Sequence, residues 1–219
     1  MNNIVINSVG GCGSKYLIRQ IANQLNVKGF ASSHKHIASP LEIPCDVDKV
    51  VFVIGDLYLS LLSFFKRRDT ITKLHGFYER DHDKPGNVFW AKEHCKNVGG
   101  DAGRLDENWG LTEYLSNQED LFKLNDFYAN WLNTGLLSER SFDVCYIKYD
   151  SFRADLKRVT DFLEIDKTRE FEPFKPRNSS YEAFSRAQIQ QLELLYGNTQ
   201  RKLEKLPHFF TKKELISMG

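Results

Sequence analysis

The chain has 219 residues, of which 41% are hydrophobic and 13% aromatic, so the composition excludes a disordered or low-complexity protein. Lys and Arg number 30 and Asp and Glu 29, and the resulting net charge of +1 argues against binding nucleic acid or an anionic membrane by bulk charge. No apolar run approaches the roughly 20 residues of a membrane span, and no secretory signal pattern is present. The four cysteines form no C-x-x-C pair, so we expect reduced thiols and a cytoplasmic protein.

The first third of the chain predicts strands that alternate with helices. Residues 3–8 are apolar and rich in β-branched side chains, as in a short buried strand. Helical spacing follows at Leu17, Ile18, Ile21 and Leu25. A second short strand is expected at 28–32. The apolar run 50–54 predicts a strand buried on both faces, as in parallel sheets, and 57–66 predicts a helix.

The rest of the chain continues this alternation after a polar stretch. Residues 75–108 lack clear periodicity, which is typical of an irregular segment that covers a substrate. The later elements are a helix, a strand, a second helix and a long last helix, expected at 119–132, 143–147, 152–163 and 181–203. The alternation predicts an α/β fold of three layers with a mainly parallel central sheet. We expect one domain over 1–219, with an insertion at about 75–140.

A glycine-rich loop separates the first strand from the first helix. Gly10, Gly11 and Gly13 let the backbone turn tightly and expose its N–H groups, and the helix start adds the positive end of its dipole. Ser14 and Lys15 supply a hydroxyl and a positive charge. This combination predicts phosphate binding, and the alternative is a tight turn that needs glycine for backbone reasons only. The order Gly-Ser-Lys differs from the Gly-Lys-Ser/Thr of a Walker A sequence.

The loop resembles the donor-binding loop of the P-loop sulfotransferases, commonly written P-K-S-G-T-T-W-L. Gly13 falls on the central glycine of that pattern, Ser14 on its first threonine, Tyr16 on its tryptophan and Leu17 on its leucine. The resemblance implies that 3′-phosphoadenosine-5′-phosphosulfate is the donor. It also implies that the phosphosulfate is held by Gly10, Gly11, Cys12, Gly13, Ser14, Lys15 and Tyr16.

Two later segments are similar to further blocks of the same family, in the same order. Residues 49–56, followed by Ser63, resemble the K-V-I-Y-x-x-R-D strand and its serine, which implies that Ser63 contacts the 3′-phosphate of the donor. Residues 145–152 and 159–163 resemble the Y-E-D-L segment and its trailing I-x-x-F-L-G. The family arginine of the first block is replaced by Gly55.

The family lysine of the donor loop falls on Gly11, and Lys15 is its expected replacement, both for donor binding and for stabilising charge on the transferred group. His36 falls on the histidine of the family's K-T-H-L-P segment, which implies a general base. The alternatives are an exposed loop histidine without chemistry, or Glu42 as the base.

Residues 174–180 resemble the late loop with which sulfotransferases close over the 3′-phosphate, which implies a donor contact by Arg177. The alternative for this segment is an ordinary helix N-cap by Ser179 or Ser180.

The expected activity is therefore transfer of a sulfuryl group to a hydroxyl or amine of a small-molecule or glycan acceptor, without a metal. One alternative is a P-loop kinase that holds magnesium on Asp56. Another is an inactive nucleotide-binding module, because Gly55 replaces the family arginine. The histidines and the cysteine at 75, 82, 94 and 95 are irregularly spaced, which argues against a zinc site.

Overall fold

A computed structural model describes residues 3–25, 34–66, 88–106, 109–165, 169–175 and 180–218, with side chains for all of these except 34 and 88–90. The chain divides into two compact units. The first comprises Met1–Gly55, Ala129–Arg177 and Lys205–Gly219, and the second comprises Asp56–Tyr128 and Asn178–Glu204. The organisation expected from the sequence, one domain with an insertion, stays a prediction.

The first unit is built on a five-stranded sheet of order β2-β1-β3-β4-β5. Its strands are β1 (Ile4–Ser8), β2 (His34–Lys35), β3 (Lys49–Ile54), β4 (Asp143–Lys148) and β5 (Phe209–Thr211). The first four are parallel and β5 is antiparallel to β4. The prediction of an α/β fold with a mainly parallel sheet is confirmed, as are the strands expected at 3–8, 50–54 and 143–147. The strand expected at 28–32 lies outside the described residues, and β5 was not expected.

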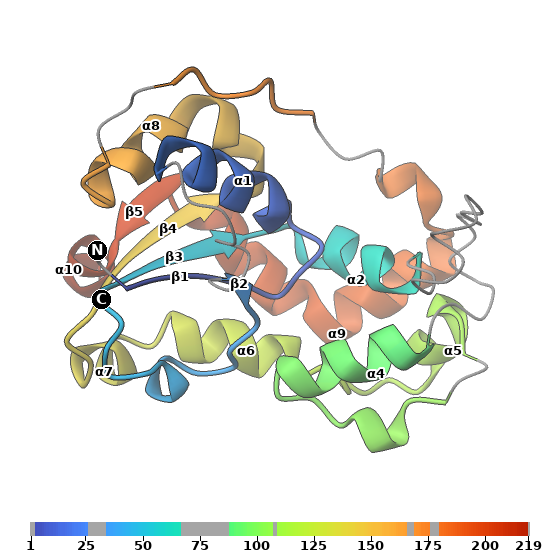
Figure 1. The fold of residues 1–219 in the computed structure, drawn as a ribbon. Helices are drawn as coiled ribbons and strands as arrows, with labels where there is room; N and C mark the ends of the chain where they lie inside the picture. Colours follow the sequence, from blue (N-terminus) through green and yellow to red (C-terminus); the bar gives the residue numbers. More distant parts are fainter. Residues whose placement is uncertain are drawn as a thin grey trace. The chain divides into compact units, whose positions relative to one another are not determined.

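Two helices, α1 (Ser14–Leu25) and α8 (Phe152–Phe162), cover one face of this sheet (Figure 1). Alternate residues of the strands meet the apolar stripes of both helices in one buried cluster, which includes Ile6, Leu17, Val51 and Ile147. Both strands are buried along their whole length, which requires cover on both faces of the sheet and explains why Ile4–Ile6 and Val50–Ile54 are continuously apolar.

The opposite face of the sheet buries large aromatic side chains. Phe52 lies 4.9 Å from Trp131 and 5.5 Å from Tyr146, measured between ring centroids, and Tyr146 stacks on Phe210 at 4.6 Å. Trp131 is the last residue of α6 (Leu124–Trp131), and its carbonyl accepts a hydrogen bond from the Tyr146 hydroxyl at 2.6 Å. The 3-10 turn η2 (Pro40–Glu42), α7 (Thr134–Ser138), η4 (Tyr149–Ser151) and α10 (Lys212–Met218) complete the regular elements described in this unit.

The second unit is helical in the part that the structure describes. Its elements are α2 (Leu57–Phe65), α4 (Val88–Asn97), η3 (Ala102–Arg104), α5 (Leu111–Ser116), the first residues of α6, η5 (Tyr181–Ala183) and α9 (Arg186–Lys205). The irregular segment expected at 75–108 is therefore wrong at α4 and η3. The reason for α4 is that His94 takes a core position, since it is 3% exposed and its ring lies 4.4 Å from that of Phe64. A polar residue type at a buried position interrupts the spacing of apolar residues by which a helix is recognised in the sequence.

Two expected helices begin later than the sequence predicts. The helix expected from residue 119 begins at Leu124, because Lys123 has a φ of 55°, a left-handed conformation that a helix cannot contain. The helix expected from residue 181 begins at Arg186, after a reciprocal pair of backbone-to-side-chain bonds between Ser185 and Gln188 that caps its start.

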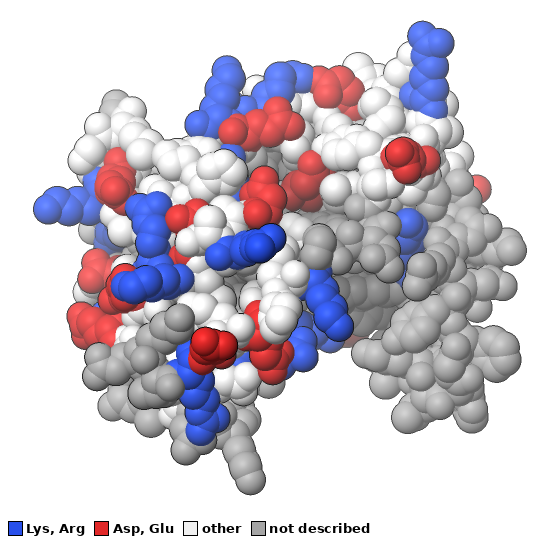
Figure 2. All heavy atoms as spheres, turned by 90° about the horizontal axis from the view of Figure 1, so that it is seen from above, with Lys and Arg blue, Asp and Glu red and all other residues white. Residues whose placement is uncertain are grey.

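On the face in Figure 2, the Lys and Arg side chains of the described residues are interspersed with Asp and Glu, as the balanced composition leads one to expect. Among the helices that the structure describes, none combines the length and the apolar character needed to cross a bilayer.

The aromatic face of the sheet yields a stability prediction. Phe52→Ala should lower the free energy of unfolding by about 3–5 kcal/mol, because it leaves a cavity beside Trp131 and Tyr146. Leu194→Ala is the control, since Leu194 is 76% exposed and its truncation should change stability by no more than about 0.5 kcal/mol. Urea unfolding of both variants checks this, and equal small losses would contradict the described packing.

Candidate functional site

The sheet reverses its order of connection between β1 and β3. The chain leaves β1 toward β2 on one side and leaves β3 toward β4 on the other, so the reversal lies between these two neighbouring strands (Figure 1). In open α/β sheets, ligands bind in the crevice outside the carboxyl ends of the strands at such a switch point. The glycine loop follows β1 and Gly55 follows β3, so both lie at this switch point.

The glycine loop adopts a backbone conformation that its glycines permit. Gly10, Gly11 and Gly13 have φ values of 86°, 66° and 76°, in the left-handed region. The helix α1 starts directly after Gly13, whose carbonyl accepts hydrogen bonds from the N–H groups of Tyr16 at 2.9 Å and Leu17 at 3.4 Å. Turns of this kind, followed by a helix N-terminus, form concave sets of N–H donors that suit anions.

Tyr149 packs directly against Gly13. A Cβ at position 13 would lie 2.4 Å from Cε2 and 2.6 Å from Cδ2 of Tyr149, and 3.3 Å from Cε2 of Phe152. Gly13 is therefore required both by its positive φ and by the ring of Tyr149. Tyr149 lies in the third family-like block, but its contact with the loop could not be read from spacing.

Tyr16 holds a segment of chain against α1. Its ring packs at 5.0 Å from Phe174 and 6.0 Å from Phe152, and its hydroxyl donates to the carbonyl of Glu172 at 2.7 Å. Burial raises the pKa of the Tyr16 phenol, and the nearby Glu172 carboxylate adds to the shift. Two glutamines of α1 continue the attachment, since Gln20 bonds Glu172 and Gln24 bonds the N–H and carbonyl of Arg169.

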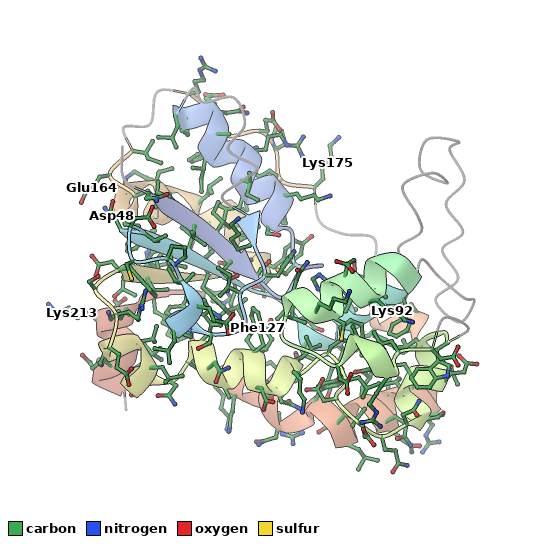
Figure 3. The ribbon with its side chains drawn as sticks, turned by 60° about the horizontal axis from the view of Figure 1, so that its bottom comes forward. Asp48, Lys92, Phe127, Glu164, Lys175 and Lys213 are labelled. Atoms are coloured by element: carbon green, nitrogen blue, oxygen red, sulfur yellow. The ribbon has the colours of Figure 1, made fainter. Side chains whose placement is uncertain are left out.

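The segment held by Tyr16 brings a lysine beside the glycine loop. Lys175 follows Phe174 and is exposed, and Figure 3 shows it near the first turn of α1 with its side chain extended away from the ribbon. Asp48 and Glu164 lie at the opposite end of the sheet, where Glu164 forms an ion pair with Lys49 at 2.9 Å. The carboxylates of Asp48 and Glu164 therefore lie at one end of the sheet, and Lys175 lies at the other.

His36 is bonded to the residue at the entry to the loop. Its Nδ1 lies 2.6 Å from the carbonyl oxygen of Ser8, the last residue of β1. A carbonyl only accepts, so Nδ1 carries the hydrogen, and Nε2 is then the accepting nitrogen of the neutral ring. The Ser8 hydroxyl oxygen also accepts the N–H of Gly10 at 3.2 Å. Ser8 therefore connects the imidazole to the glycine loop.

The other expected site residues lie on α2, η2 and α1 or outside the described residues. Ser63 is half-buried on α2, in the second compact unit, whereas the loop and His36 belong to the first. Glu42 is exposed at the end of η2, and Lys15 is exposed in the first turn of α1. Arg177 lies outside the described residues, so its contact with the donor stays a prediction.

The carboxylate of Asp56, the candidate magnesium ligand of the kinase alternative, is occupied by protein donors. One oxygen accepts the N–H of Leu59 at 2.8 Å and so caps α2. The other accepts the Tyr181 hydroxyl at 2.5 Å and the Gln200 amide at 3.1 Å. These bonds give Asp56 a structural role within the second unit.

The possible zinc ligands are only partly described. His94 is packed against Phe64, and the Cys95 thiol donates to the carbonyl of Leu121 at 3.2 Å. Burial raises the pKa of Cys95 to about 12, which disfavours the thiolate that zinc needs. Within the described ranges no group of three or more His, Cys, Asp or Glu side chains is arranged to hold a metal ion.

Comparison with known protein families gives no match for this sequence, and a search of the curated proteins finds no relative. The resemblance to the P-loop sulfotransferases, which was drawn from three short motifs, stays a prediction.

The contact between Gly13 and Tyr149 can be tested by one methyl group. Gly13→Ala should lower the free energy of unfolding by at least about 2 kcal/mol, since a left-handed backbone costs an L-residue about 1–2 kcal/mol and overpacking costs about 1–3 kcal/mol. Gly103→Ala is the matched control, because the nearest atom to its added Cβ is Asp101 Oδ1 at 3.5 Å. Equal denaturation midpoints for the two variants would show that Tyr149 does not cover the loop.

Proposed function

We propose that this protein is a sulfotransferase that uses 3′-phosphoadenosine-5′-phosphosulfate as donor and a hydroxyl or amine of a small-molecule or glycan as acceptor. One observation carries the proposal. An anion-compatible glycine loop and a histidine are joined through Ser8 at the switch point of a mainly parallel sheet. Donor-phosphate binding and proton removal are the two tasks of sulfuryl transfer, and this geometry supports both.

The donor would bind through its phosphosulfate at the glycine loop. The backbone N–H groups of residues 11–15 would act as donors, because those of Gly10 and Tyr16 already donate to the Ser8 hydroxyl oxygen and the Gly13 carbonyl. The ammonium group of Lys15 would balance charge on the transferred group. Ser63 and Arg177 would contact the 3′-phosphate. Lys175, beside the start of α1, is a further cation available to the donor phosphates.

His36 would act as the general base. The acceptor oxygen or nitrogen attacks sulfur in line, the bond between sulfur and the bridging oxygen of the 5′-phosphate breaks, and the acceptor proton passes to Nε2 of His36. The hydrogen bond from Nδ1 to Ser8 supports this role, because it fixes the tautomer in which Nε2 accepts. The step forms no covalent bond to the enzyme and is proposed without a metal.

Asp56 and Gly55 bear on the two alternatives, a kinase and an inactive nucleotide-binding module. A magnesium-dependent kinase is disfavoured because Asp56 already accepts three hydrogen bonds from protein groups. An inactive nucleotide-binding module keeps its support from Gly55, which supplies no side chain at the end of β3. Thermal shifts with 3′-phosphoadenosine 5′-phosphate and with ATP plus magnesium separate the sulfotransferase from the kinase, and an assay of sulfate transfer to an acceptor panel separates enzyme from module.

Lys15→Ala should weaken binding of 3′-phosphoadenosine 5′-phosphate by about 1.5–3 kcal/mol, the range for hydrogen bonds to charged groups. Calorimetry on the folded variant measures this. Lys213→Ala is the control, because Lys213 is an exposed lysine on α10, away from the glycine loop. Unchanged affinity in the Lys15 variant would remove this lysine from the site.

His36→Ala should reduce turnover by about 10²–10⁴-fold, the usual contribution of a general base, with donor-product affinity nearly intact. Steady-state rates with an identified acceptor, together with calorimetry, make the comparison. Full turnover in this variant would transfer the role of base to Glu42 or another carboxylate.

A further inference from the structure

The hydrogen-bond ladder between β1 and β2 ends just before the glycine loop. The last paired residues are Asn7 of β1 and Lys35 of β2. Beyond this pair, side chains replace the backbone ladder. The His36 ring bonds the Ser8 carbonyl at 2.6 Å, and the Asn7 side chain bonds the backbone of Ile37.

Asn7 holds Ile37 at two points. Its Oδ1 accepts the N–H of Ile37 at 2.8 Å and its Nδ2 donates to the carbonyl of Ile37 at 3.0 Å. The same carbonyl accepts the indole N–H of Trp131 at 2.8 Å. Both side chains are 0% exposed, so these bonds are shielded from competing water.

The position of Asn7 is unusual for an amide. The strand Ile4–Ser8 is buried along its whole length, and a carboxamide in such a place costs free energy unless its donors and acceptor are bonded. Both polar atoms of the Asn7 amide are bonded to the backbone of Ile37, the residue directly after His36.

We propose that Asn7, assisted by Trp131, is a positioning residue that keeps His36 in the tautomer and orientation required of the general base. The inference rests on the proposed function. By fixing the peptide of Ile37, Asn7 keeps Nδ1–H of His36 on the Ser8 carbonyl. Nε2 thereby remains the nitrogen that receives the acceptor proton.

The test uses Asn7→Leu, which keeps the number and branching of the side-chain heavy atoms and removes both bonds. Long-range ¹H–¹⁵N spectra of the full chain, with His36→Ala to assign the signal, report which ring nitrogen carries the hydrogen. The wild type should show His36 protonated at Nδ1, and Asn7→Leu should shift the ring toward the Nε2–H form. Turnover should fall about 10-fold or more, though less than in His36→Ala, while the affinity for 3′-phosphoadenosine 5′-phosphate changes less than about 2-fold.

Gln188→Met is the matched control. Gln188 is also a buried carboxamide bonded at both ends, since its Oε1 accepts the N–H of Ser185 and its Nε2 donates to the Thr112 hydroxyl, but it lies in the second unit and has no part in the proposed site. This variant should leave the His36 signal and turnover unchanged. In the His36→Ala background, Asn7→Leu should cause no further loss of turnover, because a positioning residue acts only through the group it positions.

Trp131→Phe carries the test if Asn7→Leu does not fold. It retains an aromatic ring beside Phe52 and removes the bond to Ile37 while leaving both bonds of Asn7, so a smaller shift of the His36 tautomer is expected. An unchanged His36 tautomer in the folded variants would overturn the inference, as would equal losses of turnover in Asn7→Leu and Gln188→Met. If the wild type transfers no sulfate at all, the proposed function fails, while the spectra still decide whether Asn7 positions His36.

Discussion

Two hydrogen bonds accepted by Ser8 connect the parts of the candidate site. Its carbonyl accepts from the ring of His36, and its hydroxyl oxygen accepts from the N–H of Gly10. Ser8 is the last residue of β1, a strand paired on both sides, so both groups are bonded to the interior of the sheet. The loop and the histidine, which lie far apart along the chain, are thereby held to one residue of the sheet.

The order of the strands explains why the site forms at this edge. Since β2 and β3 lie on either side of β1, the order of connection reverses beside β1, and ligands of open α/β sheets bind outside the carboxyl ends of the strands at such a point. The aromatic face of the sheet stabilises the segment that carries His36. Trp131 packs on Phe52 and donates to the carbonyl of Ile37, so the core and the loop that carries His36 share one side chain. Trp131 therefore connects the packing of the core to the position of the candidate base.

The sequence predicted the parts whose signal is local. Apolar runs identified β1, β3 and β4, and the glycine loop between β1 and α1 follows from Gly10, Gly11 and Gly13. It could not predict contacts between distant segments, such as Tyr149 on Gly13. Asn7 did leave a signal, a carboxamide inside an apolar strand, but its partner Ile37 is known only once β2 lies beside β1. The helix α4 was missed because His94 occupies a core position. Ser63 and Arg177 rest on the family resemblance alone.

The proposed function requires that the glycine loop at the end of β1 binds the donor and that His36 is held beside it. A crystal structure of the protein soaked with 3′-phosphoadenosine 5′-phosphate tests this most directly. We expect the 5′-phosphate within hydrogen-bond distance of backbone N–H groups of residues 13–15, with Nδ1 of His36 still on the carbonyl of Ser8. A nucleotide bound elsewhere on the chain, or none at saturating concentration, would contradict it.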